Sequence, residues 1–240
     1  MKKLTSLVAM LMIVSTRAFA QFANSGASKS TSSASTNGWQ GVTVSYNMGA
    51  LTYDMDGAKD TDLNGFSIGY VKAFSISKSL PLFVETGLKF SYATGEESYD
   101  NNWIWEGYAD IEEEKYEYTY YELQAPINLA YKFAVNEDIQ VIPYTGLYLK
   151  YNVAAEVDWS WREGYYTPDY SDIDEGGNSI DLFDDMDIEE TWNRFNFGWQ
   201  IGAKVAYKNF TAGLSYGLDL NEIGEKTKMN NFSISVGYNF

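Results

Sequence analysis

The sequence predicts an all-β fold, an eight-stranded antiparallel transmembrane β-barrel with short periplasmic turns and long extracellular loops. Three observations lead to this prediction: an N-terminal leader, segments in which large apolar residues alternate with small or polar ones, and connections that are alternately short and long. Alternation with a period of two residues is typical of a β-strand with two different faces. The final segment shows it most clearly, with apolar residues at Phe232, Ile234, Val236, Tyr238 and Phe240.

The N-terminus has the three parts of a secretory leader. Lys2 and Lys3 precede a mostly apolar run, and residues 18–20 (Ala-Phe-Ala) have the small-x-small form of a cleavage site. We expect a signal peptide at residues 1–20, since the run is too short to span a bilayer as a helix; the alternative is an uncleaved anchor. Residues 21–38 are Ser-rich without periodicity, which predicts a flexible periplasmic tail before a barrel at 39–240.

The composition excludes several classes of function. The chain has no cysteine and no histidine, so disulfides, thiolate metal sites and Ser-His-Asp or Cys-His catalysis are excluded. A formal net charge of −16 excludes nucleic acid as an expected partner. We therefore expect no cofactor and no enzymatic activity. The 20 tyrosines suit a water–lipid interface, because the ring is apolar and its hydroxyl is polar.

Eight segments carry the alternation. Within each, large aliphatic and aromatic residues share one parity, and glycines and isolated charges share the other. In a soluble sandwich the large residues would face a core, whereas in a membrane barrel they face lipid and the small residues fill the lumen. Alternation alone does not separate these two folds. In chain order the segments are residues 42–48, 66–74, 82–92, 121–133, 141–153, 195–207, 210–218 and 232–240.

The connections favour the barrel. Short connections at 77–79, 136–138 and 208–209 alternate with long ones at 52–62, 95–115, 156–193 and 221–228. This alternation is typical of outer-membrane barrels, whose turns are tight on the periplasmic side and whose loops are long outside. Eight strands would place both termini in the periplasm. Pro126 and Pro143 lie inside predicted strands, where each removes a ladder hydrogen bond, so we expect a bulge or a water at each.

Several segments resemble a known family. Residues 121–126 (Tyr-Glu-Leu-Gln-Ala-Pro), continuing to 131–133, resemble the aromatic-x-Leu-x-x-Pro strand of the outer-membrane β-barrel domain family. Residues 143–146, 195–203, 216–218 and 237–240 resemble its later strands. The resemblance implies a small porin-like barrel of the Gram-negative outer membrane. It also implies insertion by the barrel-assembly machinery through a terminal aromatic signal, Tyr238 and Phe240.

The long connections are acidic and aromatic. The acids predict a solvated, self-repelling surface, and the alternative is a divalent-cation site, for which residues 172–177 (Asp-Ile-Asp-Glu-Gly-Gly) resemble part of a calcium loop. Interleaved aromatics are suited to contacts with an external protein or glycan, or to packing of loop on loop. The candidate contact residues are Trp103, Trp105, Trp159 and Trp161.

Two further expectations concern how the strands continue. Val153, Ala155, Val157, Trp159 and Trp161 keep the outward parity of the fifth segment, which predicts a ribbon that protrudes above the bilayer. A row of tyrosines before Tyr121 alternates in the opposite phase, which predicts a β-bulge at that point. An exposed ribbon of this kind can add a strand to a partner.

Charged residues of the inward parity form a candidate network in the lumen. By height, Lys89, Glu122 and Lys150 group together, and Glu85 groups with Lys132 on neighbouring strands, while Lys204 and Asp219 lie on the sixth and seventh segments. A barrel of eight strands is wide enough only for its own side chains, which favours a charge-paired plug over a narrow ion path. We therefore expect an outer-membrane protein with a structural or surface-interaction role, in contact with outer-membrane lipid. The alternative is a porin-like channel for small solutes or ions.

Overall fold

The computed structural model describes residues 37–55, 57, 59–183 and 192–240, all within the compact unit 34–240. The predicted signal peptide, nearly all of the predicted tail and the acidic run at 184–191 lie outside the described residues. None of the described residues forms a helix long and apolar enough to cross a membrane.

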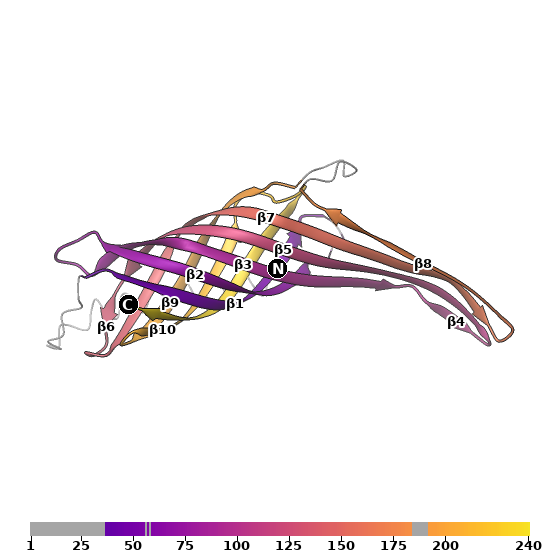
Figure 1. The fold of residues 1–240 in the computed structure, drawn as a ribbon, viewed down its shortest axis with the longest axis horizontal. Helices are drawn as coiled ribbons and strands as arrows, with labels where there is room; N and C mark the ends of the chain where they lie inside the picture. The colour runs from indigo at the N-terminus through magenta and orange to yellow at the C-terminus, as the bar shows by residue number, and fades with distance from the viewer. Residues whose placement is uncertain (1–36, 56, 58, 184–191) are drawn as a thin grey trace. The chain divides into compact units, whose positions relative to one another are not determined.

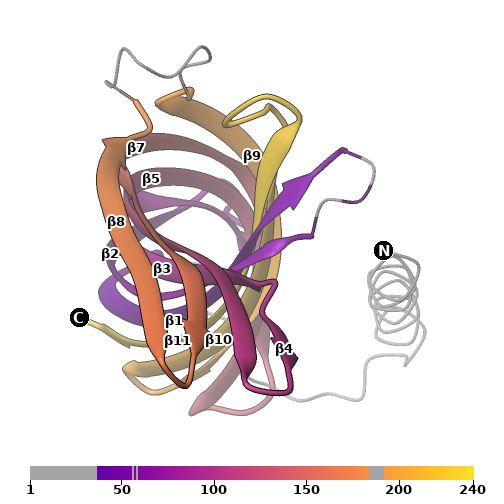
Figure 2. The ribbon, with the colours of Figure 1, turned by 90° about the vertical axis from the view of Figure 1, so that its right-hand side faces the viewer.

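Eight strands form a closed antiparallel ring (Figure 2). Each ring strand pairs with the next ring strand in sequence, β5 with β7 included, and the pairing of β1 with β11, from Gly41 opposite Asn239, closes the ring. The ring strands are β1 (Trp39–Tyr53), β2 (Thr61–Ser75), β3 (Leu82–Asp100), β5 (Tyr108–Tyr131), β7 (Ile139–Thr167), β9 (Phe195–Tyr207), β10 (Phe210–Asp219) and β11 (Thr227–Asn239). Three further strands extend it, namely β4 (Trp103–Trp105), β6 (Phe133–Ala134) and β8 (Tyr170–Asp181).

The ring is apolar outside and polar inside. Phe66, Ile68 and Leu149 point outward and are 61%, 59% and 63% exposed, whereas Ser67 of β2 and Lys150 of β7, next to them in sequence, are buried. Large apolar side chains this exposed around a whole ring would be costly in water, at about 25 cal/mol per Å². They are stable in a bilayer, so the alternation predicted from the sequence corresponds to an inside-out barrel.

Two of the predicted long loops are largely strand. β3 and β5 stay paired as far as Asp100 opposite Glu113, and β7 and β8 stay paired to their turn at Thr167 and Tyr170. Together β3, β4, β5, β7 and β8 form a sheet that continues beyond the ring (Figure 1), and we call residues 95–120 and 155–181 the ribbon. The predicted continuation of the fifth segment is confirmed, but the loop assignments are wrong for most of 95–115 and for most of the described part of 156–193.

A β-bulge lies where the ribbon leaves the ring. Tyr121 is opposite Ala154, but the next residue, Glu122, is opposite Asn152, so Val153 is left without a partner. The bulge predicted at Tyr121 is therefore confirmed, and its extra residue lies in β7 rather than in β5.

The bulge reverses the two faces of β7. Val153 is exposed on the outside, but Ala155 and Val157 beyond it are buried inside together with Tyr120. The prediction that Ala155, Val157, Trp159 and Trp161 keep the outward parity is therefore wrong. A strand that inserts one residue changes the phase of everything after it.

Neither proline causes a bulge. Pro126 is opposite Tyr148 and Pro143 is opposite Ala203, and the register of β7 is unchanged on both sides of each pair. The bulge is therefore wrong at both prolines, and the alternative, a water at each, stays a prediction. Beside Pro126 the β3–β5 ladder has a gap and resumes in the same register, and Thr86 Oγ1 donates to the Pro126 carbonyl at 2.8 Å. A side-chain donor thus compensates locally for the disturbed ladder.

Candidate functional site

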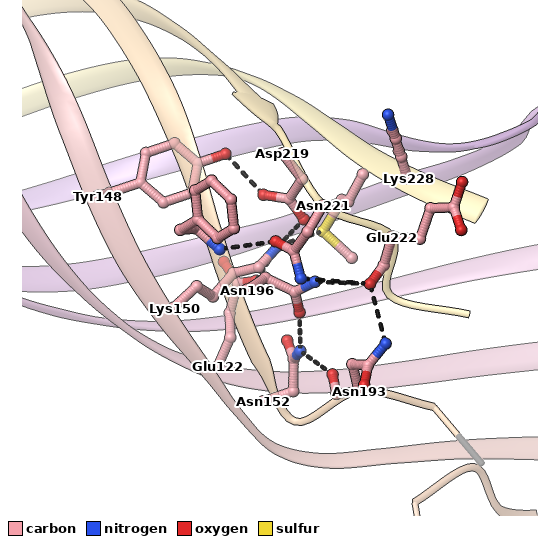
Figure 3. Close-up of polar contacts among 12 residues, drawn as sticks. Glu122, Tyr148, Lys150, Asn152, Asn193, Asn196, Asp219, Asn221, Glu222 and Lys228 are labelled. Atoms are coloured by element: carbon pink, nitrogen blue, oxygen red, sulfur yellow. Dashed lines mark hydrogen bonds and ion pairs between the residues drawn. The ribbon is translucent and has the colours of Figure 1, made fainter. Parts of the chain in front are cut away.

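The inward-facing side chains form a polar middle layer between two apolar layers. At one point of the middle layer Lys150 of β7 donates to Asp219 of β10 at 2.6 Å and lies 3.6 Å from Glu122 of β5 (Figure 3). The Tyr148 hydroxyl donates to the other oxygen of Asp219 at 2.6 Å. Its ring occupies the space that a side chain at position 198 would fill, which explains the glycine there.

A second ion pair crosses the lumen. Lys204 of β9 lies 2.6 and 2.5 Å from the two carboxylate oxygens of Glu85 on β3. Trp39 Nε1 also donates to Glu85, at 3.1 Å, and Asn128 donates to it at 3.4 Å. Both charges are buried, so the pair depends on these extra donors to offset the cost of leaving water.

Amide side chains extend from the Glu85 pair to the cavity beside the Lys150 pair. Gln124 donates to Gln200 at 3.3 Å, and Gln200 donates to Asn128 at 2.7 Å, which in turn reaches Glu85. A cavity of about 20 Å³ lies beside the Lys150 pair, which is room for about one water molecule. This layer therefore consists of side chains bound to one another, with little free volume.

The sequence grouped these charges by neighbouring strands, and the structure pairs them differently. Lys150 and Glu122 do meet, and Lys89 lines the same small cavity. Glu85 pairs with Lys204, however, and not with Lys132, and Asp219 pairs with Lys150. Long side chains in a narrow ring reach across the lumen as easily as to the next strand.

Lys132 lies at the end with the short turns. Its ammonium donates to the Asn37 carbonyl at 3.1 Å and lies 4.7 Å from the ring centroids of both Trp39 and Phe83. These rings belong to the first apolar layer, which is built from buried Ala73, Phe83, Ala130, Ile142 and Ala206. The cation–π contacts place a positive charge beside an otherwise apolar layer.

The second apolar layer lies at the end with the ribbon. Its buried members are Leu51, Leu63, Tyr120, Ala155, Val157, Leu182, Phe183, Ile223 and Met229, and we call them the mouth cluster. Leu182 and Phe183 follow β8, and Ile223 lies between β10 and β11, so connections as well as strands contribute. Sequence reasoning missed this cluster, although the apolar pair 182–183 inside an acidic run was a signal for it.

Asparagines tie these connections to the ring (Figure 3). Asn152 donates to Asn196 at 2.6 Å and to the Asn193 carbonyl at 3.1 Å. Asn193 and Asn196 each donate to the Glu222 carbonyl at 3.2 Å. These bonds hold the connection after β10 over the end of the lumen, and no pattern in the sequence indicated them.

The ribbon has two different faces, because directly opposed residues on paired strands share a face. One face continues the lumen side of the ring, and we call it the lumen-side face; the other is the outer face. The registers place Tyr99, Trp103, Trp105, Tyr108, Tyr116, Tyr118, Trp159, Trp161, Tyr165 and Tyr170 on the lumen-side face. The outer face carries one aromatic residue, Tyr166.

The four candidate tryptophans therefore share a face but differ in exposure. Trp103 and Trp105 are 58% and 65% exposed. Trp161 packs on Gly176, where a Cβ would lie 2.8 Å from its ring. Trp159 is half-buried nearer the ring, and its indole N–H has no hydrogen-bond partner among the described residues. The two outermost tryptophans are thus the ones most available to an external molecule.

Charges are also divided between the faces. The basic residues of the ribbon, Lys115 and Arg162, both lie on the outer face and are paired there. Lys115 pairs with Glu117 and, at 3.3 Å, with Glu96, and hydrogen bonds to these carboxylates raise its pKa. Arg162 lies 3.7 Å from Glu113.

Carboxylates on the lumen-side face contact tyrosines instead of cations. Glu97 accepts a hydrogen bond from Tyr99 at 3.3 Å, and Glu114 accepts one from Tyr116 at 3.1 Å. The charge of Glu97 raises the pKa of Tyr99, whereas burial and then the Glu114 hydrogen bond raise that of Tyr116. The alternative of a calcium loop finds no support in the described residues: residues 172–177 are extended within β8, and no three acidic side chains there or elsewhere in the described ranges are arranged to hold a metal.

The comparison with known protein families agrees with this architecture. The family model described as outer membrane protein beta-barrel domain matches residues 19–224. The chain belongs to this family. It is accordingly a β-barrel of the Gram-negative outer membrane, as the resemblance implied. Tyr238 and Phe240, the proposed assembly signal of this family member, are outward-facing and 43% and 62% exposed.

Similar solved structures are small outer-membrane proteins. Ail of Yersinia pestis is 13% identical, over 85% of this chain and 99% of its own, with a TM-score of 0.38. Neisserial surface protein A is 14% identical, over 87% and 98%, with a TM-score of 0.43. The outer-membrane enzyme PagL is 13% identical, over 82% and 98%, with a TM-score of 0.34. No curated protein matches the chain in sequence.

Proposed function

We propose that this outer-membrane barrel is a surface-interaction protein whose ribbon contacts a protein or glycan outside the cell. The observation that carries the proposal is the aromatic tip of the ribbon, where Trp103, Ile104 and Trp105 are all more than half exposed. Exposed tryptophan and tyrosine side chains are costly in water and are enriched at binding interfaces.

The continuous strand pairing of the ribbon also suits a binding surface. Its strands remain in continuous register to the turns, so backbone hydrogen bonds fix the aromatic side chains in position. A binding surface held in this way loses little conformational entropy when a partner binds. Loose loops of the same composition would have no such advantage.

Shortening the ribbon tests the proposal. Residues 99–114 and 159–178 are each replaced by Asn-Gly, which joins strand positions that are already paired. In nanodiscs, the full-length protein should bind members of an array of matrix proteins and oligosaccharides, and the shortened protein should bind none while its barrel stays folded. An unchanged binding profile would contradict the proposal.

The same proposal includes a lumen plugged by the protein's own side chains. Its support is the paired polar layer, the small cavity within it and the apolar layer on each side. In planar bilayers we expect no steady conductance. Steady single-channel currents would favour the alternative, a narrow porin-like path for small solutes or ions.

We further propose that the protein has no catalytic activity and is inserted by the barrel-assembly machinery. The absence of histidine supports the first part, since lipid-modifying barrels need a base to activate a serine. Lipid A mass spectra should be the same with and without the gene. For insertion, removal of Phe240 should slow assembly in cells far more than a Val236→Ala exchange on the same face of β11.

A further inference from the structure

We propose that the lumen-side face of the ribbon binds an extended polypeptide segment with lysine or arginine at alternate positions, added at the free edge of β8. This inference rests on the proposed function, because it names the class of partner that the ribbon would contact. Three observations carry it: the division of charge between the faces, the row of opposed carboxylates and the unpaired edge.

The division of charge leaves one face without cations. Both basic residues of the ribbon, Lys115 and Arg162, point to the outer face and are paired there with carboxylates. Among the described ribbon residues the lumen-side face has no lysine or arginine. Its acids are Glu97, Asp110, Glu112, Glu114, Glu163, Asp172 and Asp174.

Several of these acids lie directly opposite one another. Glu112 of β5 is opposite Glu163 of β7, which is opposite Asp174 of β8. The next row of this face toward the tip contains Asp110 and Asp172. Like charges opposed across strands destabilise a sheet, and no lysine or arginine of the described ribbon residues offsets them on this face. The Asn101 amide donates to Glu112 at 2.8 Å, but it is neutral and leaves the charge in place. A cation supplied by a partner would relieve this repulsion.

Aromatic rings surround the acidic rows. Tyr165, between Asp110 and Asp172, stacks on Tyr108 with ring centroids 6.3 Å apart and contacts Tyr170 at 5.6 Å. Ammonium and guanidinium groups bind both to carboxylates and to aromatic faces. This combination favours organic cations over an anionic glycan, which the acids would repel.

The free edge of β8 sets the form of the partner. Among the described residues β8 pairs only with β7, so its other edge has unpaired backbone groups. Tyr170, Asp172 and Asp174 lie along this edge at alternate positions, all on the lumen-side face. A strand added there would place every second side chain opposite them. Lysine or arginine at those positions would contact both Asp172 and Asp174. A metal ion or a single amino acid could not also pair with the backbone of the β8 edge.

The test uses the mature protein in nanodiscs of neutral phosphatidylcholine, with a fluorescent (Thr-Lys)6 peptide as probe. Fluorescence anisotropy should show saturable binding that weakens at high salt and is absent with empty nanodiscs and with (Thr-Glu)6. Asp172→Asn with Asp174→Asn should weaken binding at least tenfold. The matched control, Glu175→Gln with Asp158→Asn, removes the same charge from the outer face and should change affinity less than twofold.

A second pair of variants separates the faces by their aromatic residues. Trp103→Ser with Tyr165→Ser alters the lumen-side face, and Ile104→Ser with Tyr166→Ser alters the adjacent row on the outer face. Only the first should weaken peptide binding, and near-ultraviolet circular dichroism should show both folded.

Three results would overturn the inference: equal effects of the matched variants, equal binding of (Thr-Glu)6, or binding of a neutral hexasaccharide with no binding of (Thr-Lys)6. The last result would leave the proposed function intact, since the ribbon would still be the contact surface. If the proposed function itself were wrong, the protein with the shortened ribbon would keep an unchanged binding profile.

Discussion

The lumen and the ribbon are two regions of one sheet face, and they differ in whether their carboxylates are paired with basic residues. Inside the ring, Glu85 and Asp219 are buried and each is paired with a lysine. Beyond the ring, on the same side of the sheet, Glu112, Glu163 and Asp174 have no basic neighbour on their face. The difference follows from solvent: a buried charge must be compensated within the protein, whereas an exposed one can remain free for a partner.

Removing a charge inside the lumen should have the largest effect. Lys150→Met leaves Asp219 and Glu122 buried without their cation, which should cost about 3–5 kcal/mol of unfolding free energy. Urea unfolding in liposomes, followed by tryptophan fluorescence, measures it. Adding Asp219→Asn should recover part of the loss, and a single variant as stable as the parent would refute the pairing.

The mouth cluster offers a second comparison, between apolar side chains in the two regions. Phe183→Ala removes a buried ring that also lies 4.8 Å from the Arg194 guanidinium, and should cost about 3 kcal/mol. Tyr166→Ala on the ribbon, where the side chain is half exposed, should change the same unfolding midpoint very little. Equal shifts would mean that the mouth is not packed as described.

A glycine in the ribbon gives a smaller and more local effect. Gly176→Ala places a methyl group 2.8 Å from the Trp161 ring, which must then move. We expect the free energy of local opening along β8 to fall by about 1 kcal/mol, which makes amide exchange there faster, with no change in barrel unfolding. Ser179→Ala on the outer face of β8 is the control, and protection that is unchanged in Gly176→Ala would contradict the packing.

The smallest expected effect is a shift in tyrosine titration. The charge of Glu97 raises the pKa of Tyr99, so Glu97→Gln should lower it, as measured by absorbance near 295 nm. A raised pKa in the folded state means that the unfolded chain loses this proton first. The contribution of this tyrosine to the stability of the ribbon is therefore fully present below the ordinary tyrosine pKa, and it is lost as the pH rises through the folded-state pKa. Glu117→Gln on the outer face should leave Tyr99 unchanged.

The barrel itself could be predicted from the sequence because lipid imposes a strict two-residue alternation on every spanning strand. The eight segments, the short turns and the bulge beside Tyr121 were all readable from parity. The ribbon was predicted only in part, because the acids in 95–115 and 156–181 suggested solvated loops. Both of its faces meet water, so hydrophobicity no longer marked the strands there.

The pairing inside the lumen could not be predicted from the sequence. Height along a strand grouped Glu85 with Lys132, but which charges meet depends on side chains that reach across the ring, as Lys204 does. The direction of Ala155 and Val157 was missed for a different reason: one bulged residue, Val153, reversed the parity that had been extrapolated.

Carboxylate footprinting of the folded protein tests the contrast between the two regions most directly. A water-soluble carbodiimide with an amine label, read by peptide mass spectrometry, should modify Glu112, Glu163 and Asp174 within minutes. Glu85 and Asp219 should remain unmodified until the barrel is unfolded, because they are buried and paired. Labelling of these two at the same rate as the ribbon acids would contradict the account.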